Sequence, residues 1–501
     1  MIEHTPSKEP VPPKDTKHTK PNFLRVLLSH LKIGIIGFGG GAALFPVIEN
    51  ELVERQKWTD KESFDYSVVV ASVSPASPPV SICAMWSKRF ALLAAYAYAL
   101  PGTILALIIA TGFTAIGTAG MRYISFASVG IIAFIMTLLY SFIKKSYAKG
   151  ILTIPKRRYL LLVASAFVLM SGNSVRRFIA TLFALEIDAL PVPFFSINIL
   201  TLLLMAFFVI FFMGSSTSKP KLIFSLALAG LYALSNGMRG YLSAWSPWLL
   251  GLMGALSVIS IGYTFFVRKQ RGNGFHLDRK NLRNIGLFAL VAVLATVIAW
   301  IITGENIVWS FSSRVLLSAF SSFGGGQAYI GVADAFFVQT GIISPEVYTG
   351  RIIVISSAMP GPVLMNIAAG IGFTIGSELG GAFMGWVLGL MAFFVAVSAC
   401  GFGCLVMRTC FDIFKEGKRL NMVIQYVVPL ICGMLVSVAI MLLNQTTGIL
   451  AREGVSPLIG MPIMLAASGL ILLVRNKFKV KEVLLLLAAG LGSFAILAIL
   501  F

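Results

Sequence analysis

The sequence is short of charged residues, of histidines and of paired cysteines, and each shortage argues against a class of protein. Only 12% of its 501 residues are charged, whereas a soluble chain carries roughly a quarter. It has four histidines and contains neither a His-Glu-x-x-His nor a Gly-x-Ser-x-Gly motif, which disfavours the usual intramembrane hydrolases. The five cysteines include no Cys-x-x-Cys pair, so we expect small, buried, reduced thiols.

Long apolar runs make up most of the chain, which is 57% hydrophobic. Each run is long enough to cross about 30 Å of hydrocarbon as a helix, and the runs are continuous, which favours helices over a β-barrel. We therefore expect an all-α polytopic membrane protein with roughly 13–15 membrane segments. The apolar segments are 23–45, 66–86, 90–116, 123–143, 159–175, 194–214, 222–238, 245–267, 285–303, 310–333, 350–372, 379–407, 421–443, 457–474 and 483–501.

The net charge of +20 comes from short basic clusters between the apolar runs, at 144–158, 268–283, 408–419 and 475–481. This pattern is typical of cytoplasmic loops under the positive-inside rule and not of a nucleic-acid-binding surface. Residues 1–22 are rich in Pro, Lys and Thr, and we expect a disordered basic tail in the cytoplasm. If every apolar segment crosses, all four clusters lie on the side of this tail.

The chain contains an internal repeat. Phe38-Gly39-Gly40-Gly41 recurs as Phe323-Gly324-Gly325-Gly326, an offset of 285 positions. The same offset, without a gap, matches Ala43 with Ala328, Val47 with Val332, Ser72 with Ser357, Pro75 with Pro360 and Ala84 with Ala369. The repeat predicts an N-terminal transporter repeat at 23–175, connecting membrane segments at 176–303 and a C-terminal repeat at 304–501.

The two repeats are expected to run through the membrane in opposite directions. Nine apolar segments separate the two repeat starts, and an odd number of crossings inverts the second repeat relative to the first. Inverted-topology repeats with broken helices are typical of secondary transporters, in which two halves move around a site at the membrane centre.

The glycines of each repeat lie inside an apolar segment, where each weakens a helix by about 1 kcal/mol relative to alanine. A helix broken at membrane depth persists only where it is buried or lines a wet cavity, and its freed N–H groups can bind an anion. Because the motif occurs twice, we interpret 38–41 and 323–326 as parts of one anion site. Close packing of helices through small residues is the alternative.

Prolines interrupt the next segment of each repeat. The first copy reads Ser74-Pro75-Ala76-Ser77-Pro78-Pro79 and the second reads Met359-Pro360-Gly361-Pro362. Proline ends an incoming helix and is tolerated in the first turn of the next one, so we expect half-helices at 80–87 and 363–371. Their N-termini carry about half a positive charge, which suits an oxyanion. Pro75, Ser77, Pro360, Gly361 and Pro362 are therefore candidate substrate-binding residues, and simple kinks are the alternative.

The few charged residues near these segments are further candidates. Lys88 and Arg89 either extend to the membrane surface or attract the anion. Arg314 lies on the outer side in the predicted topology, where the positive-inside rule does not account for it. Glu49 and Asp334 stand at equivalent positions and are either coupling-ion carboxylates or solvated hairpin ends.

Three stretches carry a resemblance to a known family. They read Gly-Phe-Gly-Gly-Gly-Ala-Ala-Leu-Phe-Pro-Val-Ile-Glu at 37–49, Phe-Gly-Gly-Gly-Gln-Ala-Tyr-Ile-Gly-Val-Ala-Asp at 323–334 and Ala-Met-Pro-Gly-Pro-Val at 358–363. Here the chain resembles the chromate ion transporter family in its long, two-domain form, over about 23–145 and 307–445. The resemblance implies a transporter of the cytoplasmic membrane that exports chromate with the proton motive force, with sulfate as a structural analogue of the substrate.

These features together predict a secondary transporter that moves a tetrahedral oxyanion, chromate or sulfate, across the cell membrane. Its expected partners are the oxyanion and membrane lipid, without nucleic acid, and a homodimer is left open. We expect no cofactor, no metal ligand and no catalytic residue. A passive anion channel or a transporter of another small anion is the main alternative, and an intramembrane enzyme is a further one.

Overall fold

The computed structural model describes residues 21–36, 44–74, 77–115, 118–183, 219–237, 245–270, 278–322, 326–413, 418–478 and 482–500, with a few single positions between 185 and 212 and at 480. All regular secondary structure in these ranges is helical. This confirms the predicted all-α class.

The described part of the chain forms a series of helices, three of which are π-helical segments. They are α1 (Phe23–Ile36), α2 (Phe45–Glu49), the π segment Asn50–Arg55, α3 (Lys61–Val73), α4 (Pro78–Met85), α5 (Ala91–Ala115), α6 (Thr118–Gly150), α7 (Lys156–Leu182), α9 (Lys219–Gly237), α10 (Ser246–Gln270), α11 (Arg279–Thr303), α12 (Ile307–Phe320), α13 (Gly326–Ala333), the π segment Asp334–Val338, α14 (Pro345–Val347), the π segment Tyr348–Ile353, α15 (Val354–Ala358), α16 (Val363–Ile413), α17 (Lys418–Arg452), α18 (Pro457–Phe478) and α19 (Glu482–Leu500).

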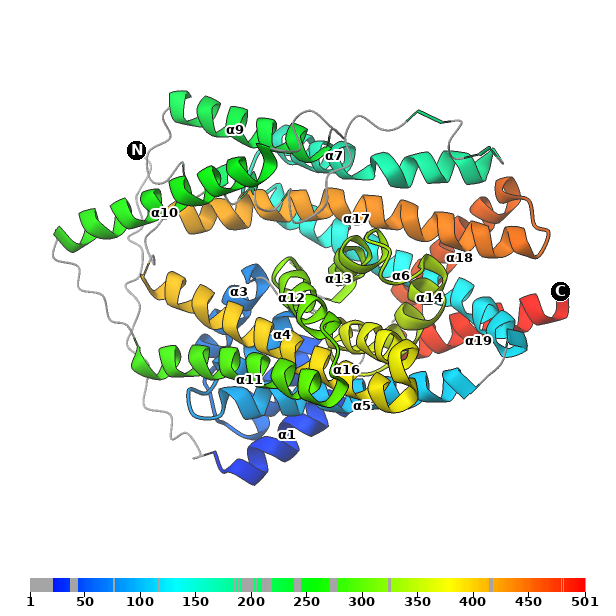
Figure 1. The fold of residues 1–501 in the computed structure, drawn as a ribbon, viewed down its shortest axis with the longest axis horizontal. Helices are drawn as coiled ribbons and strands as arrows, with labels where there is room; N and C mark the ends of the chain where they lie inside the picture. The colour runs from blue at the N-terminus through cyan, green and yellow to red at the C-terminus, as the bar shows by residue number, and fades with distance from the viewer. Residues whose placement is uncertain are drawn as a thin grey trace.

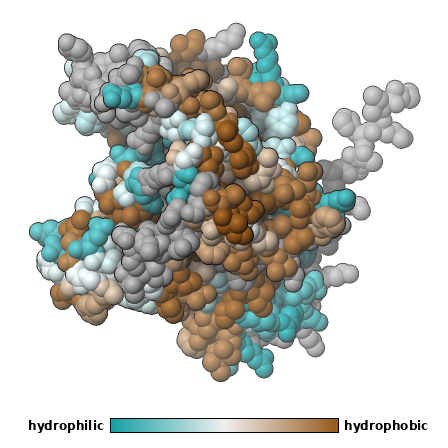
Figure 2. Space-filling model, turned by 90° about the vertical axis from the view of Figure 1, so that its right-hand side faces the viewer, coloured by the Kyte–Doolittle hydropathy of each residue, from teal (hydrophilic) through white to brown (hydrophobic). Residues whose placement is uncertain are grey.

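Hydrophobic side chains cover much of the outside of the molecule. Within the described ranges, five helices are long and apolar enough to cross a membrane. Two of them, α11 and α18, expose Leu294, Ile301, Leu470 and Leu473, each at least 48% accessible. Figure 2 shows broad hydrophobic surface interrupted by separate hydrophilic patches. Because such surface is stable only in contact with lipid or protein, the chain is a multi-pass membrane protein.

Three long central helices, α5, α11 and α16, define two ends of the molecule. The start of α11 lies beside the end of α16, where Asn281 Nδ2 donates to Thr409 Oγ1 at 2.9 Å. The start of α16 lies beside the later part of α5, where Thr103 Oγ1 donates to Asn366 Oδ1 at 3.1 Å. We call the end with Arg279 and Arg408 the basic end, and the end with Thr303 and Gly381 the far end; they lie at the left and right of Figure 1.

The first repeat enters from the basic end and returns to it twice. α1 has fourteen residues, about 21 Å of helix, which is too short to cross about 30 Å. The chain then returns, because Ser29 of α1 donates to Glu51 at 3.2 Å; we call residues 23–55 hairpin 1a. α3 and α4 form a second hairpin, 61–85 or hairpin 1b. The rings of Trp58 and Trp86, which flank it, stack at 5.1 Å.

The second repeat makes the same pair of hairpins from the far end. α12 also has fourteen residues, and Arg314 donates to the carbonyl of Phe336 at 3.3 Å, which closes hairpin 2a (307–338). In hairpin 2b (345–379), Gly370 of α16, the returning arm, packs on Ile352 of the entering arm. The chain then turns at Gly380 and Gly381, and residues 382–413 run back across the molecule to the basic end.

The described hairpins therefore enter from opposite ends, in the inverted arrangement that the sequence repeat predicts. The expected crossings at 23–45, 66–86, 310–333 and 350–372 are instead returning hairpins. Two successive crossings would bring the chain back to the side where it started, and two returning hairpins do the same. The predicted side of each later segment is therefore unaffected. Two of the four basic clusters, 268–283 and 408–419, agree: Lys88 pairs with Asp278, Arg408 donates to Met85 O at 2.7 Å, and all of these residues lie at the basic end.

Candidate functional site

The candidate residues fall into those that the structure describes and those that it does not. Ser77, Gly326, Pro360, Gly361, Pro362, Lys88, Arg89, Arg314, Glu49 and Asp334 are described. Phe38, Gly39, Gly40, Gly41, Pro75, Phe323, Gly324 and Gly325 lie outside the described residues. The site is therefore built from the inner ends of the hairpin arms that flank them.

The inner turn of hairpin 2b is held by Asn366, whose side chain is fully buried. Its amide nitrogen donates to the carbonyls of Ser356 and Pro360, both at 3.3 Å, and its amide oxygen accepts from Thr103. Gly361 has φ +82°, a conformation in which only glycine is comfortable. The prolines on both sides and the one amide together fix the turn before α16 begins at Val363.

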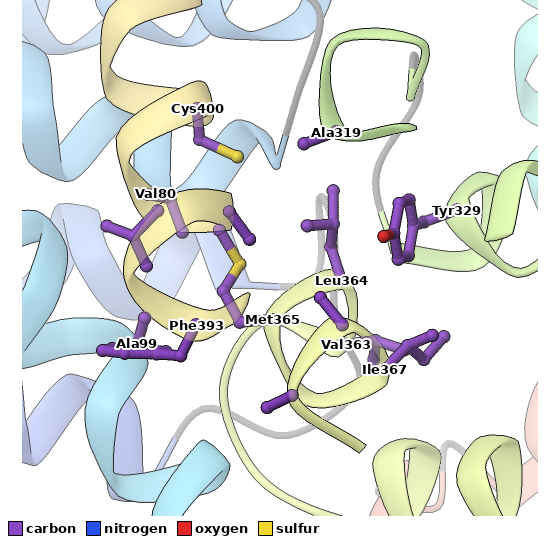
Figure 3. Close-up of a cluster of buried hydrophobic side chains, with 14 of the residues drawn as sticks. Val80, Ala99, Ala319, Tyr329, Val363, Leu364, Met365, Ile367, Phe393 and Cys400 are labelled. Atoms are coloured by element: carbon purple, nitrogen blue, oxygen red, sulfur yellow. The ribbon is translucent and has the colours of Figure 1, made fainter. Parts of the chain in front are cut away.

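Each inner turn packs on the long helix of the other repeat. The Ser77 N–H of hairpin 1b faces Cys400 Sγ of α16 at 3.4 Å. The Pro360 carbonyl of hairpin 2b lies against Gly102 of α5, so closely that a Cβ at Gly102 would overlap it. Figure 3 shows the same convergence, with Val80, Leu364, Ala319 and Tyr329 in one buried cluster beside Cys400. The inner ends of the two repeats therefore meet in the middle of the molecule.

Two helices begin at this meeting point. α4 starts at Pro78 and α16 at Val363, and these positions are 285 apart, the offset of the sequence repeat. All eight residues of α4 are buried. The first N–H groups of a helix have no partner within the helix, but Pro78 and Pro79 carry none. The two inverted helix starts therefore present partial positive charge to one buried region, with Val80 as the first donor of α4 and Val363 and Leu364 as the first donors of α16.

Buried hydroxyl groups without a partner mark the same region. In the described part of the chain, the side-chain oxygens of Ser81, Tyr98 and Ser322 are buried and make no hydrogen bond. Ser81 lies in the first turns of α4, and Ser322 directly precedes the second Phe-Gly-Gly-Gly motif. A buried hydroxyl without a partner costs about 1–3 kcal/mol, so these groups are suited to bind something that the chain itself does not supply.

The basic candidates lie away from this region. Lys88 is at the basic end, where it pairs with Asp278, and the neighbouring Arg89 lies 5.2 Å from the ring of Phe90. The Lys88 hydrogen bond lowers the pKa of the Asp278 carboxyl below its ordinary 3.8. Arg314 joins the arms of hairpin 2a through Phe336. Each of them has a structural contact in the hairpin framework.

The acidic candidates belong to the hairpin arms, in a register that differs from the sequence match. Glu49 pairs with Lys61 between hairpins 1a and 1b. The structural counterpart of Asp334 is Glu51, since each carboxylate accepts from a glutamine amide five residues later, at 2.8 Å from Gln339 and at 2.9 Å from Gln56. Glu51 also pairs with Lys32 and Arg55, at 3.3 and 3.2 Å.

Sequence reasoning missed Asn366 and Glu51. Asn366 stands 285 positions after Ser81 and is a lone amide in an apolar stretch, a signal that could have marked it. Glu51 sits two residues beyond Glu49, and only the π-helical turn shows which of the two is buried. Among the described residues, no group of three His, Cys, Asp or Glu could hold a metal ion.

Comparison with known proteins decides the family. A family model described as chromate transporter matches residues 24–231 and 309–494, which contain the hairpins of the first and second repeats. The chain belongs to the chromate transporter family. This confirms the resemblance to the long, two-domain form and makes the protein a transporter.

Two curated relatives are transporters whose names give no substrate. An uncharacterized transporter of Methanocaldococcus jannaschii is 31% identical over 114 residues, which cover 22% of this chain and 28% of that protein. YwrB, an uncharacterized transporter of Bacillus subtilis, is 31% identical over 83 residues, 16% of this chain and 42% of YwrB. The matched part of the chain thus spans less than half of either relative. No solved structure matches the chain.

Proposed function

We propose that this chromate transporter family member is a secondary transporter that moves a tetrahedral oxyanion, chromate or sulfate, through the meeting point of its four hairpins. The observation that carries the proposal is the pair of inverted helix starts at Pro78 and Val363, close to the unpartnered hydroxyls of Ser81 and Ser322. Helix starts and hydroxyls donate hydrogen bonds without a full positive charge, which suits an anion that must bind and then leave.

We further propose that the protein lies in the cytoplasmic membrane with the basic end in the cytoplasm. The residues at this end include Lys88, Arg89, Arg279 and Arg408, and cytoplasmic loops carry the excess of Lys and Arg. The N-terminal side of α1 then faces the cytoplasm as well. Hairpins 1a and 1b enter from the cytoplasm, and hairpins 2a and 2b enter from outside.

Export is the direction that we propose for chromate. A membrane potential that is negative inside favours the exit of an anion by about 2.3 kcal/mol per charge for every 100 mV. A dianion therefore leaves the cell with a driving force of about 4.6 kcal/mol at that potential. Glu49 and Asp334 stay our candidates for a coupling ion, and Glu51 joins them as the structural counterpart of Asp334.

Flux into proteoliposomes tests the transporter proposal. Purified protein should give saturable uptake of labelled chromate or sulfate that responds to an imposed pH gradient. Linear flux that ignores the gradient would favour the passive channel, and an absence of flux with any small oxyanion would contradict the proposal.

A matched pair of glycine variants connects this flux to the inner turn of hairpin 2b. Gly361 and Gly454 have nearly the same φ, +82° and +84°, so alanine strains both by about 1–2 kcal/mol. Gly454 lies between α17 and α18, away from the inner turns. We expect Gly361→Ala to reduce flux at least tenfold and Gly454→Ala to leave it nearly unchanged.

A further inference from the structure

Hairpin 2b encloses a cavity of about 310 Å³, within the roughly 300–1,000 Å³ typical of small-ligand sites. Its walls are the two arms of the hairpin, the far-end part of α5 and the turn at Gly381. The polar residues in its wall are Arg351, Ser356, Asn366, Thr374, Ser377 and Glu378. None of these residues belongs to the motifs that the sequence singled out.

The cavity leads from the far end towards the inner turn. Its outer part is lined by Glu378, which is exposed, and by Ser377. Its inner part is lined by Ser356 and Asn366, which are 1% and 0% accessible. Because Asn366 binds the Pro360 carbonyl, the inner wall of the cavity is the support of the Pro-Gly-Pro turn itself.

The charge of the wall comes from two residues. Arg351, on the π segment Tyr348–Ile353, is half-buried, and Glu378 stands at the rim. A guanidinium presents up to five N–H donors in a planar fork that matches the oxygens of an oxyanion. The hydroxyls of Thr374 and Ser377 donate to helix carbonyls, at 2.9 Å each, so they offer an anion no proton. Arg351 is the one positively charged residue among the described residues that line the cavity, so we assign the attraction of an anion to it.

Aromatic rings pack together at the basic end. There, His30, Trp58 and Trp86 stack in parallel, with Trp58 and Trp86 5.1 Å apart and His30 and Trp86 5.6 Å apart. Trp86 Nε1 donates to His30 Nε2 at 3.1 Å. At the offset of 285, Arg351 corresponds to Tyr66 and Asn366 to Ser81, so the first repeat has no counterpart of the arginine. Among the described residues, the cavity that Arg351 lines lies at the far end.

We propose that this cavity is the outer binding vestibule for the transported oxyanion, with Arg351 as the residue that captures it before it reaches the inner turn. The proposal deepens the proposed function and rests on it. A single guanidinium in a water-accessible cavity binds an anion weakly, which is appropriate for a site that hands its ligand on. Glu378 repels a dianion at the rim and limits that affinity.

Four variants test the proposal by sulfate or chromate flux driven from the far end in oriented proteoliposomes. Arg351→Gln should raise the KM at least about tenfold, the loss expected for one charge-assisted hydrogen bond, whereas Arg351→Lys should stay within about threefold because it keeps the charge. Glu378→Gln should lower the KM by up to about fivefold, the range of an exposed charge. Glu305→Gln, an exposed far-end carboxylate outside the cavity wall, should change nothing.

A labelling measurement gives a readout that needs no transport. The Ser377→Cys variant, in intact cells, is treated from outside with membrane-impermeant methanethiosulfonates that carry either a sulfonate or a trimethylammonium group. The anionic reagent should react faster than the cationic one. Arg351→Gln removes one positive charge from the wall and should lower the ratio of the anionic to the cationic labelling rate at least about threefold. Protein without the new cysteine gives the background.

The outcomes separate the two proposals. An unchanged KM and an unchanged labelling ratio in Arg351→Gln would overturn the vestibule, even if the wild-type protein transports sulfate. A Ser377→Cys variant whose new thiol does not react from outside would also overturn it. Wild-type protein that moves no oxyanion would instead overturn the proposed function, whatever the labelling ratio shows.

Discussion

The two repeats consist of the same pair of hairpins, but the outgoing arms of their second hairpins differ in length. Hairpins 1a and 2a both start with a fourteen-residue helix, and the second helices of hairpins 1b and 2b begin at equivalent positions, Pro78 and Val363. The outgoing arm of hairpin 1b, however, is the eight-residue α4, while that of hairpin 2b runs from Val363 to the turn at Gly380. The longer arm leaves room for a cavity at the far end, and stacked aromatic rings lie at the basic end.

The difference between the far end and the basic end lets the fold distinguish the two sides of the membrane, as transport requires. Two identical halves would make the same barrier on both sides of the membrane, and nothing in the fold would distinguish inside from outside. In this chain, the far end has a charged cavity that reaches the inner turn, and the basic end has the ring stack and the ion pairs of Glu51. In the described part of the chain, the cavity therefore opens towards the far end.

The largest effect is expected where the two repeats touch. In Gly102→Val the new side chain would overlap the Pro360 carbonyl, so α5 and the inner turn of hairpin 2b must separate, at about 3 kcal/mol. We expect transport to be lost and the melting temperature of the purified protein to fall by several degrees. Gly112→Val on the same helix is the control, because nothing lies within 4 Å of its Cβ position. Equal effects of the two variants would show that the contact at Pro360 is unimportant.

A second pair of variants compares Asn366, which supports the inner turn of hairpin 2b, with Ser81, a proposed anion-binding residue at the equivalent position. Asn366→Ala leaves the carbonyls of Ser356 and Pro360 without their shared donor, which should cost on the order of 2 kcal/mol. Ser81→Ala removes a buried hydroxyl that makes no hydrogen bond and should raise the melting temperature or leave it unchanged, since no bond is lost and the cost of burying an unpartnered hydroxyl is relieved. Thermal unfolding in detergent measures both. A Ser81→Ala variant as unstable as Asn366→Ala would mean that the two positions play the same structural role.

The ring stack at the basic end can be weakened by removing one hydrogen bond. Trp86→Phe keeps an aromatic ring in the stack but removes the indole N–H that donates to His30, a loss of about 1 kcal/mol. If the stack is the barrier, this variant populates the state open to the basic end more often. Outside labelling of Ser377→Cys should then slow by up to about fivefold. Phe64→Leu, a buried change in the same hairpin outside the stack, is the control and should leave labelling unchanged.

The smallest effect is expected for Asp278→Asn, which breaks the pair with Lys88 and keeps a residue able to cap the start of α11. The pair is largely exposed and should contribute less than about 0.5 kcal/mol. Its carboxyl has a lowered pKa, chiefly through Lys88, so the contribution is present above the ordinary pKa and is lost as the pH falls through the lowered one. Melting curves of wild type and variant should differ slightly at pH 7 and converge at acid pH. A difference that grew on acidification would contradict this origin.

The sequence predicts the helical class, the inverted repeat and the place where the second broken helix starts, because apolar length, repeated glycines and prolines are local signals. It predicts 80–87 for the first half-helix, and α4 occupies Pro78–Met85. The hairpins were not predicted, since an apolar run has the same composition whether it crosses the membrane or returns. The second half-helix continues beyond 371 to the turn at Gly380, as no proline or charge stops it earlier.

The candidate site was predicted in its turns and not in its side chains. Pro360 and Gly361 stand out because their backbone chemistry is visible in the sequence. Ser81, Ser322 and Arg351 do not, because the burial of a hydroxyl without a partner, or the position of an arginine in a cavity wall, depends on how elements distant in the chain pack together. The motifs 38–41 and 323–325 lie outside the described residues, and their predicted role stays a prediction.

The most direct test of the central claim is equilibrium binding of labelled sulfate or chromate to the purified protein. We expect the double variant Ser81→Ala with Ser322→Ala to bind at least about tenfold more weakly than wild type, as expected when two hydroxyl donors are lost, while its melting temperature in the absence of the anion does not fall. Tight binding of the oxyanion by the double variant, with a dissociation constant equal to that of wild type, would contradict an anion site at the meeting point of the two repeats.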